Sequence, residues 1–180
     1  MKMEDVSSNT RSIILPTDDT KKEIKTQKVK KVRVVTRDKK WTICDNDYNS
    51  DLQLSIMKDA DISNNVYNLM CCEIKRKIAG YKSQDQKKNK YSEKDFIDID
   101  FIKETILQNE LKCYYCCECV YVLYKSVREP KQWSVERMDN KYGHNKNNIT
   151  IACLECNLKR KTIYHERFRF TKQLTISKLD

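Results

Sequence analysis

The chain has 180 residues, which is room for one domain of ordinary size and an appendage, and its 36 Lys and Arg outnumber its 26 Asp and Glu to give a net charge of +10. This balance favours a polyanionic partner, either nucleic acid or an anionic membrane surface. Hydrophobic residues make up only 39% of the chain. They form no run of about 18, so we expect no segment that spans a membrane.

Glycine and proline are scarce, at two each, which argues against a turn-rich β-sandwich and favours helices joined by a few long loops. The N-terminus has no apolar segment of the kind found in a secretory signal. Nine cysteines are an odd number for a disulfide framework. We therefore expect an intracellular protein of the cytoplasm or nucleus, neither secreted nor membrane-bound, whose cysteines bind a metal in a reducing compartment.

Positive charge is concentrated at the two ends of the chain. Residues 1–40 hold 12 basic and 6 acidic side chains, and residues 113–180 hold 13 and 7, whereas residues 41–112 hold 11 and 13. Residues 1–50 have little helical or strand periodicity, so we predict a basic and largely disordered arm. Such an arm either stays solvated, anchors on phosphates or serves as a nuclear-type address.

The segment 52–112 is predicted to be helical. Apolar side chains recur at every fourth position up to residue 78, and Asp61 or Ser63 is placed to cap the start of a helix that Gly80 ends. Cys71 and Cys72 have no suitably spaced partner, and we interpret them as small packing residues. The apolar face consists of Ile62, Val66, Met70, Ile74 and Ile78.

Residues 81–94 are polar and are predicted to form a loop. A second helix should follow Asp98 or Asp100 and lead directly to the first cysteine of the C-terminal third. Its buried side would be formed by Ile102, Ile106 and Leu107.

Two Cys-x-x-Cys pairs, Cys113/Cys116 and Cys153/Cys156, are separated by 36 residues. Each pair places two thiolates on one side of a tight turn, and two such turns complete a tetrahedral sulfur site for Zn²⁺. A closed site of this kind is structural, because it leaves no coordination position for a substrate. Cys116 and Cys119 have the same spacing and remain an alternative to the first pair, which has aromatic residues inside the turn and is preferred.

The segment between the cysteine pairs has the order strand, loop, strand, helix. Residues 133–138 alternate in polarity and predict a strand, residues 140–143 have the composition of a turn, and residues 149–151 predict a second short strand. A helix rich in Lys and Arg is predicted from Leu154 onward. One zinc ion would hold this unit at both ends.

These motifs resemble the signature of the HNH endonuclease family, in the form found in large DNA viruses and phages. They are CYYC at 113–116, QWSVERMDN at 132–140, GHN at 143–145 and CLECNLKR at 153–160.

The resemblance covers roughly residues 94–172 and implies an α+β fold, with N-terminal helices followed by a small zinc-stapled ββα-metal module. Together with the composition and periodicity of the preceding residues, it predicts a basic arm at 1–50, a helical segment at 52–112 and a zinc-stapled HNH nuclease-like domain at 113–172.

Members of this family hold a single divalent metal, Mg²⁺ or Mn²⁺, between the strand and the helix. The resemblance assigns Glu136 and Asn157 as its ligands, and both offer hard oxygen atoms. Asn148 matches the Asn that steadies the loop, and Asp139 is a second candidate ligand or a partner for Arg137. The metal would contact the scissile phosphate and neutralise charge on the leaving 3′ oxygen.

The sequence departs from the best-known form of the family at Arg137, where a His usually follows the acid and activates the attacking water. Arginine is a poor base but a good phosphate clamp. His144, in the same loop, is the candidate base, or else a turn residue that contacts substrate or the sheet. Glu136 is one methylene longer than the Asp common in related sequences, which would weaken catalysis if it moved the metal. His165 is interpreted as a surface or packing residue.

Basic residues in the predicted C-terminal helices would contact phosphates of a nucleic acid, the alternative being a solvated helix face. Phe168 and Phe170 are expected to pack against the zinc knuckles. The basic residues are Lys159, Arg160, Lys161, Arg167 and Arg169.

We therefore expect a metal-dependent HNH endonuclease that hydrolyses phosphodiester bonds in double-stranded DNA and leaves 5′-phosphate and 3′-hydroxyl ends. Zn²⁺ would be structural, and Mg²⁺ or Mn²⁺ catalytic. The alternative is a zinc-knuckle nucleic-acid-binding protein with weak or no cleavage, which the Arg at 137 would explain. A third interpretation, a structural or transcription-associated subunit, predicts no affinity for nucleic acid at moderate salt.

Overall fold

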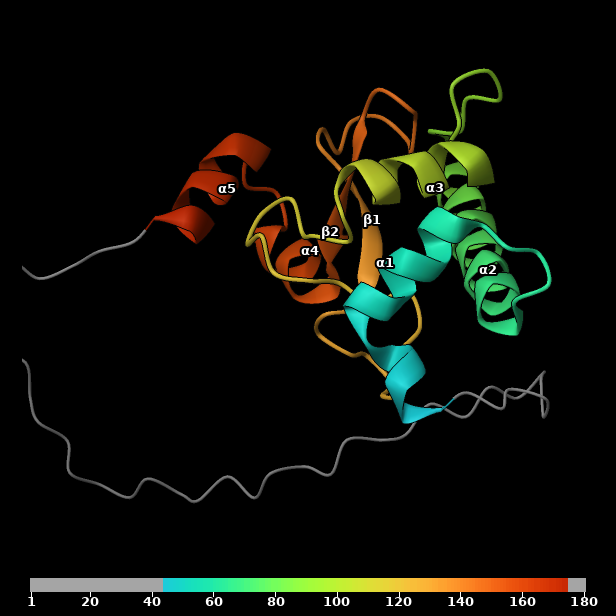
Figure 1. The fold of residues 1–180 in the computed structure, drawn as a ribbon. Helices are drawn as coiled ribbons and strands as arrows, with labels where there is room; N and C mark the ends of the chain where they lie inside the picture. Colours follow the sequence, from blue (N-terminus) through green and yellow to red (C-terminus); the bar gives the residue numbers. More distant parts are fainter. Residues whose placement is uncertain (1–43, 175–180) are drawn as a thin grey trace, which may run out of the picture.

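The computed structural model describes residues 44–174 (Figure 1). Most of the predicted basic arm, residues 1–43, lies outside this range. The chain enters the described part through a short 3₁₀ helix, η1 (Asp45–Tyr48). Within the described residues, no helix is both long and apolar enough to cross a membrane.

The architecture is a set of helices around a small antiparallel sheet, which confirms the mixed helical and strand composition expected from the sequence. The sheet has two strands, β1 (Trp133–Arg137) and β2 (Ile149–Cys153). Their register pairs Trp133 with Cys153 and Arg137 with Ile149. Helix α4 (Leu154–Arg160) follows β2 directly and packs on both strands, and α5 (His165–Gln173) ends the described chain. The predicted strand, turn, strand and helix are thus all present.

Two helices occupy the first part of the segment predicted to be helical: α1 (Ser50–Asp59) and α2 (Asn65–Lys87). Helix α2 begins next to the predicted start, but its cap is Asn64 and not Asp61 or Ser63. Ala60 takes a left-handed conformation that ends α1, and the side chain of Asn64 caps α2 by accepting hydrogen bonds from two backbone N–H groups. Ile62 therefore lies in the turn between them with 79% of its surface exposed, and does not join the apolar face.

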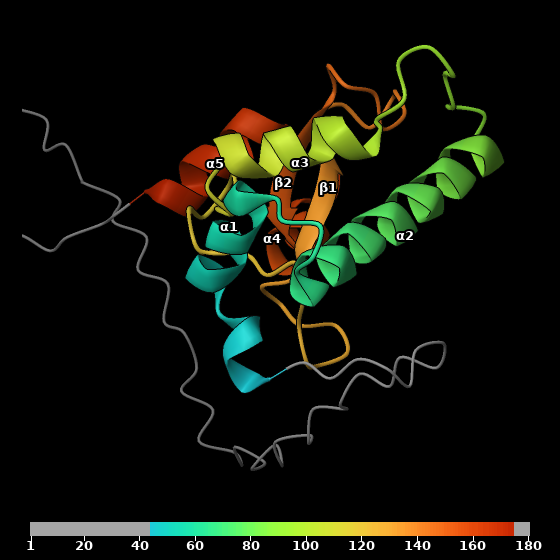
Figure 2. The same cartoon turned by 45° about the vertical axis from the view of Figure 1, so that its right-hand side comes forward.

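Helix α2 continues past Gly80 for two further turns, so the loop predicted at 81–94 begins only after Lys87. A glycine inside a helix costs about 1 kcal/mol, which tertiary contacts easily offset. Those contacts come from one face of α2, where Lys77, Tyr81 and Asp85 are spaced four residues apart. Tyr81 Oη accepts a hydrogen bond of 3.0 Å from the backbone N–H of Val135 on β1. Figure 2 shows α2 running alongside the sheet.

Helix α3 (Ile99–Gln108) agrees with the prediction. Asp98 caps it by accepting a hydrogen bond of 2.8 Å from the N–H of Phe101. Ile102 and Ile106 are fully buried, and Leu107 is partly buried against the same core.

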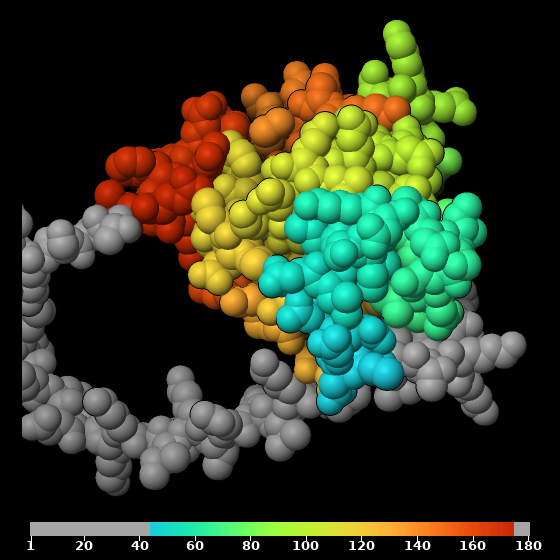
Figure 3. Space-filling view, in the orientation of Figure 1, coloured from blue at the N-terminus to red at the C-terminus, as the bar shows by residue number. Residues whose placement is uncertain are grey.

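One apolar core joins the helices to the sheet and to the cysteine-rich segment that follows α3. Figure 3 shows α1, α3 and that segment packed against one another, with α5 projecting from one side. Cys71 packs partly against this core, as predicted. Cys72 is exposed, so its prediction as a packing residue is wrong. The fully buried aromatic side chains at the centre of the core are Tyr115 and Trp133.

Gln53 is a buried polar link between α1 and the cysteine-rich segment. Its Oε1 accepts hydrogen bonds from the N–H groups of Val122 (2.8 Å) and Leu123 (3.1 Å), and its Nε2 donates to the Leu123 carbonyl (3.1 Å). Because all of these groups are buried, they have no water to replace a lost partner.

Replacing Gln53 with Ala should lower the free energy of unfolding by about 2 kcal/mol, because it leaves buried backbone groups without hydrogen bonds. Urea denaturation of the metal-loaded protein measures this. Gln108→Ala is the matched control. Gln108 is exposed, and its side chain donates a hydrogen bond to Glu104 on the same helix. Equal stability of the two variants would contradict the assigned role of Gln53.

Candidate metal centre and active-site pocket

Four cysteines form a compact group that could hold a metal ion. Cys113 and Cys116 come from the segment after α3, Cys153 ends β2, and Cys156 lies in the first turn of α4. Their Sγ atoms all lie within 4.8 Å of one another. Zn–S bonds of about 2.3 Å in a tetrahedron place sulfur atoms about 3.8 Å apart, so the group fits such an ion with small adjustments.

The backbone explains why these four cysteines meet. The N–H of Tyr114 donates to the Ile151 carbonyl (2.9 Å), which lays the first Cys-x-x-Cys turn along the outer edge of β2. Cys117, with φ of 59°, closes this turn. Cys119 lies outside the group, so the structure selects Cys113 with Cys116 over the alternative pair. Within the described residues this is the one cluster of His, Cys, Asp and Glu side chains placed to hold a metal.

The thiols of the cluster do not ionise equally. A hydrogen bond with the Cys153 thiol lowers the pKa of Cys113 to about 5, while burial raises the pKa of Cys156 to about 12. A metal ion binds cysteine in the thiolate form, so its binding at the cluster would release protons.

A pocket of about 590 Å³ lies beside the cluster, between α2, β1 and α4. It brings together residues that are far apart in the sequence, including four of the residues predicted to take part in the reaction. These are Glu136, Arg137, His144 and Asn157.

His144 is fixed by a carboxylate that comes from α2. Its backbone N–H donates to Asp85 Oδ2 (2.6 Å), and its ring Nδ1 lies 2.9 Å from Asp85 Oδ1. Because a carboxylate only accepts hydrogen bonds, Nδ1 carries the proton and Nε2 keeps a lone pair. The ring stacks on Tyr81 at 4.5 Å. Burial lowers the pKa of His144 despite the opposing charge of Asp85, so the imidazole is neutral near pH 7.

Asp85 is the main residue of this site that the sequence analysis missed. It is fully buried, and it was assigned to a loop because Gly80 was taken as the end of the helix. The available signal was that Asp85 continues the four-residue spacing of Lys77 and Tyr81. Gly143 is required at this contact, because a Cβ there would come within 2.7 Å of Asp85 Oδ2.

Asn148 holds the loop between the strands. Its Oδ1 accepts from the N–H of Asp139 (2.9 Å), and its Nδ2 donates to the carbonyls of Asp139 (2.9 Å) and Gly143 (3.0 Å). Asp139 itself is exposed and faces a different cavity from Glu136. Arg137 does not pair with Asp139: its Nη1 lies 4.0 Å from Asp85 Oδ1 and 3.4 Å from the Tyr142 carbonyl.

Arg160 corrects the prediction of a phosphate contact on the helix surface. It is only 2% exposed, and its Nε donates to Oε1 of Glu136, which is also buried. Its Nη atoms donate to the carbonyls of Ile163 (2.8 Å) and Arg137 (2.7 Å) and to Asn140 Oδ1 (3.3 Å). The guanidinium thus ties β1, the loop and the end of α4 together.

Glu136 and Asn157 offer oxygen atoms that suit a hard divalent ion. Burial raises the pKa of Glu136, and the guanidinium groups of Arg160 and Arg137 oppose that rise. With Oε1 engaged by Arg160, the second carboxylate oxygen is the one available to a metal. Asn157 Nδ2 donates to Ser134 Oγ (3.1 Å), which leaves its Oδ1 as an acceptor. Two such ligands fit Mg²⁺, which keeps several waters and completes its shell with substrate oxygens.

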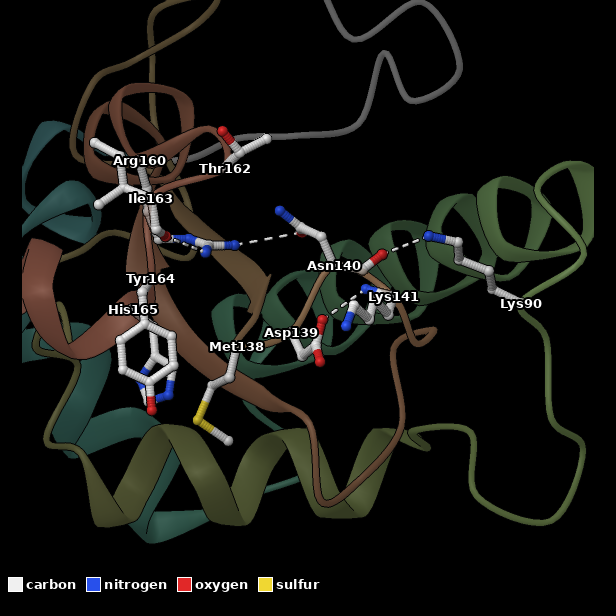
Figure 4. Close-up of a pocket in the computed structure, with 10 residues that line it drawn as sticks. All are labelled: Lys90, Met138, Asp139, Asn140, Lys141, Arg160, Thr162, Ile163, Tyr164 and His165. Atoms are coloured by element: carbon white, nitrogen blue, oxygen red, sulfur yellow. Dashed lines mark hydrogen bonds between the residues drawn. The ribbon is translucent and has the colours of Figure 1, made fainter.

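A second cavity of about 540 Å³ adjoins the first and shares Lys90, Asn140 and Arg160 with it. Figure 4 shows the Arg160 guanidinium directed towards Asn140, with Lys90 reaching the same loop from the opposite side. Tyr164 and His165 line this cavity on the same side as Arg160.

Among the other predicted surface residues, Lys161 is exposed and lines the first pocket. Lys159 pairs with Glu155, Arg167 is exposed, and the Arg169 guanidinium lies 4.6 Å above the ring of Tyr114.

The packing of α5 is only partly as predicted. Phe168 is buried edge-on against Tyr115 at 5.0 Å, which agrees with packing on the first knuckle. Phe170 is 65% exposed, so its predicted packing is wrong. His165 is partly buried near the rings of Tyr164 and Tyr114, which agrees with a packing role.

Comparisons of the chain with known protein families, with curated proteins and with solved structures find no match.

Zinc binding should depend on the four clustered cysteines alone. Wild-type protein and Cys119→Ser should each carry one zinc ion per chain, because Cys119 lies outside the cluster. Cys153→Ser should lose zinc and stability together, since it removes one of four ligands. Metal analysis by mass spectrometry with thermal denaturation measures both. Loss of zinc from Cys119→Ser, or full retention by Cys153→Ser, would overturn the assignment.

Proposed function

We propose that this protein is a Mg²⁺- or Mn²⁺-dependent endonuclease of the HNH type that hydrolyses phosphodiester bonds in double-stranded DNA. The observation that carries the proposal is the His144 imidazole, which a buried carboxylate orients in the same pocket that presents Glu136 and Asn157. An oriented neutral histidine beside hard oxygen ligands is the arrangement that metal-assisted hydrolysis needs.

Four residues of the pocket have a part in the proposed reaction. Nε2 of His144 accepts a proton from water, whose oxygen forms a bond to phosphorus as the bond from phosphorus to the 3′ oxygen breaks. The 3′ oxygen takes a proton from solvent, so the products are a 5′-phosphate and a 3′-hydroxyl. Glu136 and Asn157 would hold a divalent ion, which would supply positive charge at the leaving oxygen. Arg137 binds a non-bridging phosphate oxygen.

The four-cysteine group is proposed to hold Zn²⁺ in a structural role. Four sulfur ligands leave no open position for a substrate. The ion would fix the junction of β2 and α4, and Asn157 follows Cys156 directly. We propose that the protein acts inside the cell, in a reducing compartment, because thiols must stay reduced to bind zinc.

The proposed substrate is nucleic acid because the pocket and its surroundings are basic. Lys88 and Lys161 are exposed at the rim of the pocket, and Arg167 is exposed on α5. Such side chains contact phosphates without reading sequence, so binding should weaken steeply as salt rises.

The second candidate function is nucleic-acid binding without cleavage. The observation that favours it is the buried pair of Glu136 with Arg160, which already supplies the carboxylate with a cation. If a metal does not bind beside that pair, the same basic surface would still hold DNA.

Zinc-loaded protein should nick supercoiled plasmid in Mg²⁺ or Mn²⁺. Glu136→Ala and Asn157→Ala should each lower the nicking rate by on the order of 100-fold or more, because each removes a ligand of the ion that stabilises the transition state. The assay is run with equal amounts of folded, zinc-replete protein.

Glu155→Ala is the matched control, because Glu155 is an exposed carboxylate on α4 that pairs with Lys159. Its rate should equal that of wild type. Plasmid binding without nicking by wild type in either metal would exclude the nuclease and leave the second candidate function.

The nicking rate should fall at acidic pH as His144 becomes protonated. Burial lowers the pKa of His144 in the folded protein below its ordinary value of 6.5, so the rate should stay constant down to a pH below 6.5 and then fall. A nearby metal ion would lower this midpoint further. His144→Gln should slow nicking on the order of 100-fold and abolish the acid limb. A mutant that keeps both the rate and the acid limb would show that another group is the base.

A further inference from the structure

The pocket carries far more positive than negative charge. Among the side chains that line it, one is a carboxylate, that of Glu136, and five are cationic. The carboxylate of Asp85 is hydrogen-bonded to the His144 ring and is not part of the lining. The cationic lining residues are Lys88, Lys90, Arg137, Arg160 and Lys161.

Glu136, the carboxylate that would bind a metal, already has its charge neutralised by Arg160. Arg160 contacts Glu136 directly, and three further acceptors hold its guanidinium: the Arg137 and Ile163 carbonyls and Asn140 Oδ1. These bonds keep the guanidinium from swinging away. A divalent cation approaching Glu136 in the free protein is therefore repelled by a fixed charge at contact distance and by further cations around the rim.

A phosphate group removes this obstacle. Its charge is attracted by the same cations that repel a metal, and its oxygens supply ligands that Mg²⁺ or Mn²⁺ prefers. Lys88 and Lys161 are exposed and can reach a phosphate. Arg137 is partly exposed, and its Nη1 makes two long contacts, with Asp85 Oδ1 and with the Tyr142 carbonyl. A pocket that repels a divalent cation when empty therefore attracts one when a phosphate is bound.

We infer that this pocket binds the phosphate of its substrate first and takes up the divalent metal only together with it. The inference rests on the metal ligands of the proposed function, and it adds an order of binding to them. Because binding free energies are linked, the factor by which phosphate strengthens metal binding equals the factor by which metal strengthens phosphate binding.

The test uses Mn²⁺ and thymidine 5′-monophosphate, whose phosphate corresponds to the 5′ end of the product. The electron paramagnetic resonance signal of free Mn²⁺ reports metal binding to zinc-loaded protein, with and without the nucleotide. Isothermal titration calorimetry reports nucleotide binding, with and without Mn²⁺. Protein-free titrations correct for the direct complex of Mn²⁺ with the nucleotide.

The nucleotide should bind without added Mn²⁺, and saturating nucleotide should tighten Mn²⁺ binding at least tenfold. Arg137→Gln should strengthen Mn²⁺ binding to the free protein and reduce the coupling factor, because it removes one repelling charge. Lys88→Gln should act in the same direction and keeps the test independent of any folding defect in the first variant. Lys75→Gln, an exposed lysine on α2 outside the pocket, is the control and should change neither.

Mn²⁺ binding that is equally tight with and without nucleotide would overturn the inference, as would the absence of nucleotide binding. These results are distinct from failure of the proposed function. Coupled binding without plasmid nicking would leave the inference intact and exclude the nuclease. Nicking with uncoupled Mn²⁺ binding would support the nuclease and exclude the order of binding.

Discussion

The contact among four cysteine sulfur atoms is the constraint on which the rest of this structure depends. Two strands of five residues each do not form a stable sheet by themselves in water. The cluster ties the segment after α3 to the end of β2 and the start of α4, and so closes a loop of 36 residues between the cysteine pairs. Closing such a loop removes much of the entropy of the unfolded chain. The residues of the pocket are held by this junction, and Asn157 lies one residue beyond it.

The second constraint is long-range, because α2 completes the site from outside the strand and helix module. One face of α2 covers the free edge of β1 through Tyr81 and then reaches His144 through Asp85. The module alone would leave the His144 ring without the carboxylate that sets its tautomer. The helical segment and the strand and helix module therefore share one apolar core and also one pocket.

Features that depend on local spacing could be predicted from the sequence, and features that depend on tertiary contacts could not. The cysteine pairs, the two strands, α4 and the Asp98 cap of α3 follow from motif spacing and capping chemistry. Asp85 was missed because a glycine such as Gly80 commonly ends a helix. Contacts with β1 stabilise α2 beyond Gly80. The pairing of Glu136 with Arg160 was missed because it joins a strand to a helix 24 residues later. Without that pairing, Arg160 resembles any other basic residue on an exposed helix.

The most direct test of the proposed active site is a crystal structure of the zinc-loaded protein with Mn²⁺ and a DNA duplex, phased to show anomalous scattering from manganese. The account predicts a manganese peak between Glu136 and Asn157, bonded to a phosphate oxygen, with Nε2 of His144 facing the phosphorus atom. A phosphate bound elsewhere on the protein, or a Glu136 that contacts Arg160 with no manganese beside it, would contradict a nuclease site in this pocket.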